Sequence, residues 1–208
     1  MVDLKDQNTT NMNKFLLNTS ICLLFISITK AQSTAENNSG DPFALVNLER
    51  HQFNFNLISP GFSYEFGLFK NQTISTGVGF GIATYEPGFA LGLVLNNRYR
   101  YYHNFNRRIN KGRNVSGNSG NYIAAAQAIY FSQLRLATNI TGPNDFNVGF
   151  YGMVYGVQRT YKSGFNFNAE LGAGYYQGDG VDSGIGPMLH FTFGWVATKR
   201  KSRTPTFD

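Results

Sequence analysis

The chain has 208 residues, a length typical of a single domain, and a formal net charge of +6. Only 14% of the residues are charged, whereas a soluble domain carries about 25%, and glycine and aromatic residues are abundant. This composition argues against an ordinary soluble enzyme, and the single cysteine argues against a disulfide-stabilised fold.

The N-terminus has the pattern of a secretory signal. Lys14 supplies a positive charge, Phe15–Ile28 is a short apolar run, and Thr29-Lys30-Ala31 fits a cleavage site. The run is shorter than the ~20 residues that a membrane-spanning helix needs. We therefore predict a cleavable signal peptide over residues 1–31, with Met12 as the natural start because the residues before it are polar.

The predicted mature chain contains no thiol, because the only cysteine, Cys22, lies within the apolar run. A thiol-free chain suits an oxidising compartment and offers no zinc–thiolate site. Residues 32–50 are predicted to be a periplasmic leader that is polar at its start. Asp41-Pro42 fits the start of a short helix through Glu49, and the alternative is an early start to the first strand.

From His51 onward, apolar and polar residues alternate with a period of two, which is typical of β-strands. Turn residues separate the alternating segments. The segments predict eight strands, which contain His51–Leu57, Phe62–Leu68, Ile74–Ile82, Phe89–Phe105, Tyr122–Gln133, Phe146–Arg159, Phe165–Gly174 and Ile185–Trp195.

The count of eight depends on Ser59-Pro60-Gly61, which fits either a tight turn or a bulge. A bulge would merge two strands and leave seven. We prefer the turn, because an even number of neighbouring strands can close into a barrel without a free edge. Alternating strands of about 9–11 residues are the signature of transmembrane barrels. The predicted fold is all-β: an eight-stranded antiparallel up-and-down transmembrane β-barrel over residues 51–198, followed by a basic tail, 199–208.

The fourth predicted strand indicates which face points inward. One parity carries large apolar residues, and the other carries small and polar residues that include Arg98 and Arg100. An arginine that faces lipid at the bilayer midplane would cost roughly 2–4 kcal/mol, so we expect both in the lumen. Glu65 and Glu170 occupy the polar parity of their strands, and buried charges need partners. We therefore predict a luminal charge cluster of these four residues, in a barrel narrow enough to be filled.

In a membrane barrel the apolar parity faces lipid, and the lumen is polar. For the sixth predicted strand, this rule predicts that Val148, Phe150 and Val154 face outward. A soluble, exported, lipocalin-like lipid carrier is the alternative. It has the reverse arrangement, with a dry cavity lined by apolar residues such as Leu93 and Phe167.

Charges of opposite sign collect at opposite ends of the predicted barrel. If connections alternate between the two ends, one end gathers the basic tail and the basic connection Arg107, Arg108, Lys111 and Arg113. The other end gathers acidic residues, with Arg135 as the exception: Glu86, Asp145, Asp179 and Asp182. The basic end is expected to face the periplasm. There the basic connection either binds a periplasmic partner or is simply solvated.

Several motifs carry a resemblance to a known group of proteins. They are Ser63-Tyr64-Glu65-Phe66 before a Lys-Asn turn, the run from Arg98 to Phe105, Arg107-Arg108, Lys111-Gly112-Arg113, and Asn118-Ser119-Gly120-Asn121-Tyr122. The chain resembles uncharacterised outer-membrane β-barrel proteins of the Bacteroidetes type. That resemblance implies a fold and a location, and it supplies no catalytic residues. The basic extension Lys199–Asp208 departs from the terminal aromatic residue that usually ends such barrels.

No catalytic, metal or cofactor site is predicted. His51, His103 and His190 lack the spacing of metal ligands, and Ser183-Asp182 has no histidine expected nearby. Clustered acidic residues in the predicted outer loops fit flexible turns as well as a cation site.

The function that the sequence favours is a non-enzymatic outer-membrane barrel with a filled polar lumen, which serves envelope structure or interaction. We expect a monomer in contact with outer-membrane lipid. A nucleic-acid partner is not expected, because the pattern is that of an exported barrel. The alternatives are the soluble carrier and a narrow channel.

Overall fold

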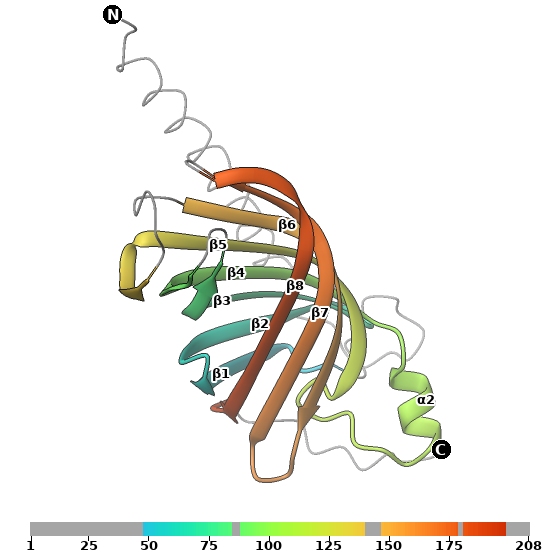
Figure 1. The fold of residues 1–208 in the computed structure, drawn as a ribbon. Coiled ribbons are helices and arrows are strands. Elements are labelled where there is room, and N and C mark those ends of the chain that lie inside the picture. Colours follow the sequence, from blue (N-terminus) through green and yellow to red (C-terminus); the bar gives the residue numbers. More distant parts are fainter. Residues whose placement is uncertain (1–47, 85–87, 140–146, 179–180, 199–208) are drawn as a thin grey trace, which may run out of the picture. The chain divides into compact units, whose positions relative to one another are not determined.

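The structure is a computed structural model, and it describes residues 48–84, 88–139, 147–178 and 181–198. The predicted signal peptide, most of the leader and the basic tail lie outside the described residues, as do Glu86, Asp145 and Asp179. Within the described parts the chain forms eight antiparallel strands and one short helix (Figure 1). No helix in these parts is long and apolar enough to cross a bilayer.

The strands lengthen from the first pair to the later ones. The first two have 8 and 9 residues, and the others have 12 to 19. Their bounds are β1 His51–Ile58, β2 Gly61–Phe69, β3 Gln72–Ala83, β4 Ala90–Tyr102, β5 Gly120–Thr138, β6 Asn147–Thr160, β7 Phe165–Gly178 and β8 Val181–Val196, with helix α2 at Phe105–Asn110.

Each strand pairs with the next, and β8 pairs with β1, so the sheet is a closed up-and-down barrel. The prediction of eight antiparallel strands in one closed sheet is confirmed. Ser59 and Pro60 form a turn between β1 and β2, so the bulge interpretation is wrong. Ser59 has a φ of 52°, the left-handed conformation that tight turns often need. The turn also contacts β3, because the Phe80 N–H donates to the Pro60 carbonyl over 3.0 Å.

The barrel has a polar interior and an apolar exterior. On β1, the inward residues Gln52, Asn54 and Asn56 are buried, and the phenylalanines between them are exposed. The same alternation continues around the sheet. The exposed outer residues of the eight strands are mostly apolar or aromatic, including Phe55, Phe62, Val78, Ile123, Met153, Leu171, Leu189 and Trp195.

The sixth strand departs from the predicted orientation. Val148, Phe150 and Val154 are buried toward the lumen, and Met153 and Tyr155 lie on the exposed face. The reason is local packing: the Phe150 ring packs against Tyr176 of β7 at 4.9 Å between centroids. Both parities of this strand contain large apolar or aromatic residues, so alternation alone does not determine its orientation.

The fourth strand is shorter than predicted, because it ends at Tyr102 instead of Phe105. Phe105 opens the six-residue helix α2, is fully buried, and stacks on Tyr102 with 4.7 Å between ring centroids. Burial of this ring draws the connection against the barrel. The helix was not predicted, because Phe105 and Ile109 are its only apolar residues with helical spacing and no side chain caps its start.

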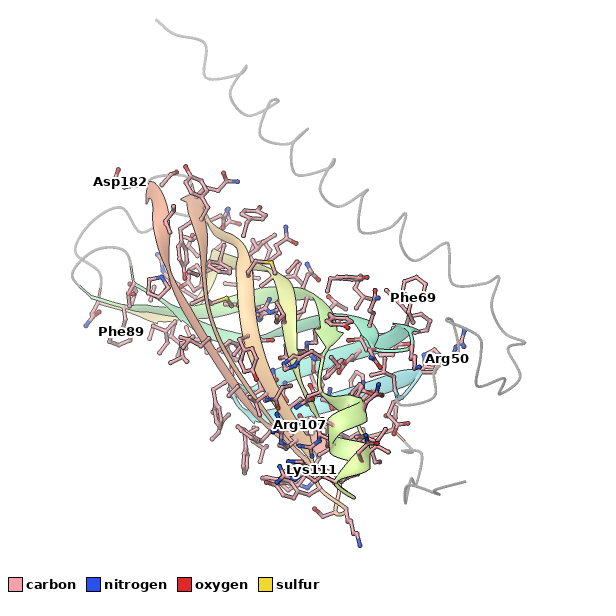
Figure 2. All side chains as sticks on the ribbon, turned by 90° about the vertical axis from the view of Figure 1, so that its right-hand side faces the viewer. Arg50, Phe69, Phe89, Arg107, Lys111 and Asp182 are labelled. Carbon is pink, nitrogen blue, oxygen red and sulfur yellow. The ribbon has the colours of Figure 1, made fainter. Side chains whose placement is uncertain are left out.

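The barrel has two ends, the α2 end and the Asp182 end. The α2 end holds helix α2, the β2–β3 turn, the β6–β7 turn, the start of β1 and the end of β8. The Asp182 end holds the β1–β2 turn and the start of β8. Figure 2 shows Arg107 and Lys111 far from Asp182 along the barrel.

Candidate functional site

The candidate site is the lumen, and its centre is the predicted luminal charge cluster. The structure brings Glu65 of β2, Arg98 and Arg100 of β4, and Glu170 of β7 together. Arg98 Nε lies 3.0 Å from Glu170 Oε2. Arg100 bridges both acids, with Nη1 at 3.1 Å from Glu65 Oε2 and Nη2 at 3.4 Å from Glu170 Oε1. Each of the four residues is at most 7% exposed.

The cluster is electrically balanced, since two guanidinium groups face two carboxylates. Balance matters here because an unpaired charge in a low-dielectric interior costs several kcal/mol. Arg98 also donates from Nη1 to the backbone carbonyls of Asn97 and Gln127, over 2.9 and 2.8 Å. The ion pairs of Arg98 and Arg100 therefore link β4 to β7 and β2, strands that are not neighbours in the sheet.

Neutral side chains complete the hydrogen bonding of both carboxylates. Glu65 Oε1 accepts from the Thr73 and Tyr102 hydroxyls over 2.7 and 2.8 Å. Glu65 Oε2 also accepts from Gln158 Nε2 over 3.2 Å. The Tyr122 hydroxyl lies 2.6 Å from Glu170 Oε1, and the Arg100 guanidinium lies 4.7 Å from the centre of the Tyr122 ring. Our sequence reasoning missed these partners, although the inward parity of each strand was the signal that could have found them.

A histidine joins the cluster from the last strand. His190 Nδ1 lies 3.0 Å from Glu170 Oε2, the oxygen that also accepts from Arg98. The sequence pattern of the last strand puts His190 on the polar parity with Thr192, but it names no partner for it. Its position on β8 is opposite Glu170 of β7 in the strand register, which explains the contact.

The half of the lumen at the α2 end is filled. A small cavity of about 40 Å³ borders the charge cluster and extends toward the β1–β2 turn; it is lined mainly by polar residues, and it has room for very few waters. Below it, an apolar cluster covers the barrel end with residues from strands, helix and return loop: Leu48, Tyr102, Phe105, Val115 and Tyr122.

The half of the lumen at the Asp182 end is hollow. It contains a cavity of about 650 Å³, and Asn96 and His190 line both this cavity and the small one. The larger cavity has a mixed lining. Polar residues contribute to it, including Ser59, Asn96, Asp182 and His190. The apolar and aromatic side chains come from β4 to β8 and include Val94, Ala128, Tyr130, Val148, Phe150, Tyr176 and Met188. The prediction of a filled lumen therefore describes one half of the barrel.

The basic connection lies at the α2 end, away from the luminal charge cluster. Arg107, Lys111 and Arg113 are exposed, whereas Arg108 is half-buried and donates from Nη2 to the Asn114 carbonyl over 2.7 Å. Burial, followed by the nearby charges of Arg159 and Arg113, lowers the pKa of Arg108 to about 10. The connection is therefore a surface with several mutually repelling cations.

The described residues include no group of three or more histidine, cysteine, aspartate or glutamate side chains that could hold a metal ion. Within the luminal cluster, the carboxylates are engaged by arginines and hydroxyls, so the arrangement is suited to holding strands together. No family model, curated protein or solved structure matches this chain.

Proposed function

We propose that this protein is a monomeric, non-enzymatic β-barrel of the bacterial outer membrane, in contact with membrane lipid. The observation that carries the proposal is the inverted distribution of polarity. Charged and amide side chains are buried inside the barrel in its α2 half, and the outward faces of the strands are mostly apolar. Transmembrane barrels have this arrangement, and monomeric soluble proteins rarely expose apolar patches larger than a few hundred Å².

The two alternative functions fit the geometry less well. A lipocalin-like carrier requires Leu93 and Phe167 inside, but both lie on the outward parity, where Phe167 packs against Phe191 at 5.7 Å between centroids. A channel requires a continuous aqueous path. The charge cluster and the Phe105 cap at the α2 end argue against such a path.

The resemblance to Bacteroidetes-type outer-membrane barrels agrees with this proposal, and so does the predicted export signal. The exposed cations of the basic connection, Arg107, Lys111 and Arg113, are suited to a periplasmic partner with an acidic surface. The proposed role is therefore envelope structure or interaction, with the barrel as the anchor.

Fractionation and heat-modifiable gel migration test the location. We expect the protein in the outer-membrane fraction, with a compact form that migrates faster before boiling. Recovery as a soluble periplasmic monomer would contradict the proposal.

Cysteine labelling tests which face meets lipid. The only native cysteine lies within the predicted signal peptide, so Leu93→Cys introduces the one thiol of the mature chain. We expect Leu93→Cys to react with a lipid-soluble maleimide and to resist a water-soluble one. His103→Cys, at the exposed end of the β4–β5 connection, is the control that a water-soluble reagent should label. Equal labelling of both sites by the water-soluble reagent would argue for a soluble protein.

A further inference from the structure

The wall of the barrel has a gap between β3 and β8 at the Asp182 end. Pairing of β8 with β1 covers only Phe193 to Val196, so Val181–Thr192 has β7 as its sole strand partner among the described residues. That stretch is 12 residues, or about 40 Å along the strand. On the other side of the gap, pairing of β3 with β2 ends at Gly79. Figure 1 shows β8 beside β1 at one end only.

The short hairpin of β1 and β2 is the cause of the gap. These strands have 8 and 9 residues, whereas β8 has 16. The β1–β2 turn therefore reaches β3 at Phe80, where the Ser59 hydroxyl donates to the Phe80 carbonyl over 2.6 Å. Beyond Phe80, the residues 81–83 of β3 have no β2 neighbour.

The large luminal cavity opens into this gap. Along most of the wall only inward residues line it, such as Val94, Ala128 and Val148. At the two edges of the gap, outward residues line it as well: Ile82 on β3 and Ile185 and Leu189 on β8. At these edges the cavity is therefore bordered by residues of both faces of the sheet, whereas along β4 to β7 only inward residues border it.

The edges of the gap are apolar and highly exposed. Ile185, Leu189 and Ile82 are 86%, 78% and 69% exposed. They continue the apolar outer surface of the barrel into the aromatic and aliphatic lining of the cavity. A ligand that arrives sideways from the surrounding apolar phase meets apolar side chains at these three edge positions, and Asp182 at the start of β8 is the acidic residue of the lining.

We propose that this cavity binds a single hydrocarbon chain of an amphipathic lipid, which enters through the gap between β3 and β8. The inference rests on the proposed membrane location. The cavity of about 650 Å³ lies within the range of ligand pockets, roughly 300–1,000 Å³. Its lining suits a methylene chain, and its floor at Asn96 and His190 marks where the polar half of the lumen begins.

A β-strand of another protein fits the gap less well than a hydrocarbon chain. Pro187 lies in the stretch of β8 that pairs with β7 but has no strand on the β1 side. Proline has no backbone N–H, so the hydrogen-bond ladder that an added strand would use lacks a donor there. A hydrocarbon chain requires no backbone donor from β8, and it can occupy both the gap and the cavity.

Fluorescence quenching by brominated chains tests the proposal. The chain has one tryptophan, so Trp195→Phe combined with Met188→Trp places a single reporter at an inward position of the cavity wall. One arm uses phosphatidylcholine vesicles with brominated acyl chains, and the other adds brominated palmitic acid to unbrominated vesicles. Quenching in the first arm identifies a membrane lipid as the source of the chain, and quenching in the second arm alone identifies a free fatty acid.

Filling variants distinguish occupancy from surface contact. Ala128→Phe adds a ring inside the cavity, and Ala125→Phe adds the same ring to the exposed outer face of the same strand. We expect Ala128→Phe to lose most of the reporter quenching and Ala125→Phe to retain it. Val94→Phe, which fills the cavity from β4, replaces Ala128→Phe if that variant does not fold.

Heat-modifiable migration, measured on the same vesicles, separates the two proposals. Absence of the compact form in membranes overturns the proposed function. An inserted barrel that shows no quenching in either arm overturns only the lipid-chain site. The lipid-chain site is also overturned if Ala128→Phe and Val94→Phe leave the quenching unchanged. An inserted dimer that pairs through β8 and excludes the brominated chains would overturn it as well.

Discussion

The two halves of the lumen are enclosed by the same sheet but have opposite interiors. At the α2 end, two arginines, two glutamates and their hydroxyl partners pack together beside a cavity of about 40 Å³. At the Asp182 end, a cavity of about 650 Å³ is open, and apolar and aromatic side chains provide much of its lining. The inward residues also differ in kind. On β7 they are Asn166, Asn168 and Glu170 in the filled half, whereas Val94, Phe150 and Tyr176 line the hollow half.

The two halves differ in how their side chains connect the strands. The filled half cross-links the barrel, because its ion pairs and hydrogen bonds connect β2, β4, β7 and β8 across the lumen. The hollow half contributes fewer polar contacts and interrupts the wall. We therefore expect stability to be concentrated in the filled half and ligand binding in the hollow half.

The largest expected effect is the loss of Glu170. Glu170→Ala leaves Arg98 without its carboxylate and removes one of the two carboxylates that contact Arg100. Removal of one partner from a buried ion pair costs about 3–5 kcal/mol, so the free energy of unfolding in urea should fall by that amount. Asp182→Ala, at an exposed position of the other half, should change it by no more than about 0.5 kcal/mol. Equal effects at both sites would refute the division into two halves.

A smaller effect is expected from two hydroxyl deletions. Tyr122→Phe removes the group 2.6 Å from the Glu170 carboxylate, and a hydrogen bond to a charged group contributes about 1.5–3 kcal/mol. Tyr176→Phe removes a hydroxyl that donates to the Pro187 carbonyl in the hollow half, a neutral bond that contributes about 0.5–1.5 kcal/mol. Urea unfolding of both variants measures the difference. A larger loss in Tyr176→Phe than in Tyr122→Phe would reverse the assignment.

The last comparison uses a matched pair of glycines, one in each half, and the Gly184 variant has the smallest expected effect of all. A Cβ at Gly156 would lie 2.1 Å from the Tyr122 ring, so Gly156→Ala must displace that ring from Arg100 and should cost about 1–3 kcal/mol. A Cβ at Gly184 has no heavy atom within 4 Å. Gly184→Ala should therefore stay within about 0.5 kcal/mol of the native free energy of unfolding. A destabilising Gly184→Ala would show that the hollow half is packed.

Several parts of the structure were predictable from residue patterns. The alternation around Arg98 and Arg100 placed both arginines on the inward parity, and the turn residues at Ser59-Pro60 separated β1 from β2. Helix α2 was not predictable, because it is only six residues long and has no capping side chain. The burial of Phe105 against Tyr102 holds it in place. The inward turn of Val148 and Phe150 was missed for a similar reason, since β6 is apolar or aromatic on both faces.

The sequence by itself determined the inward or outward face of most strand residues, because a strand alternates its side chains locally. Only the tertiary structure decided how far along the barrel each residue lies. That position depends on the hydrogen-bond register of every strand pair around the ring. Register brings Glu170 to Arg98, 72 residues away in the chain. It also sets where β1 meets β8, so that residues 181–192 of β8 pair with β7 but have no strand neighbour on the β1 side. Alternation therefore specified which residues of most strands face the interior, and register divided that interior into a filled half and a hollow half.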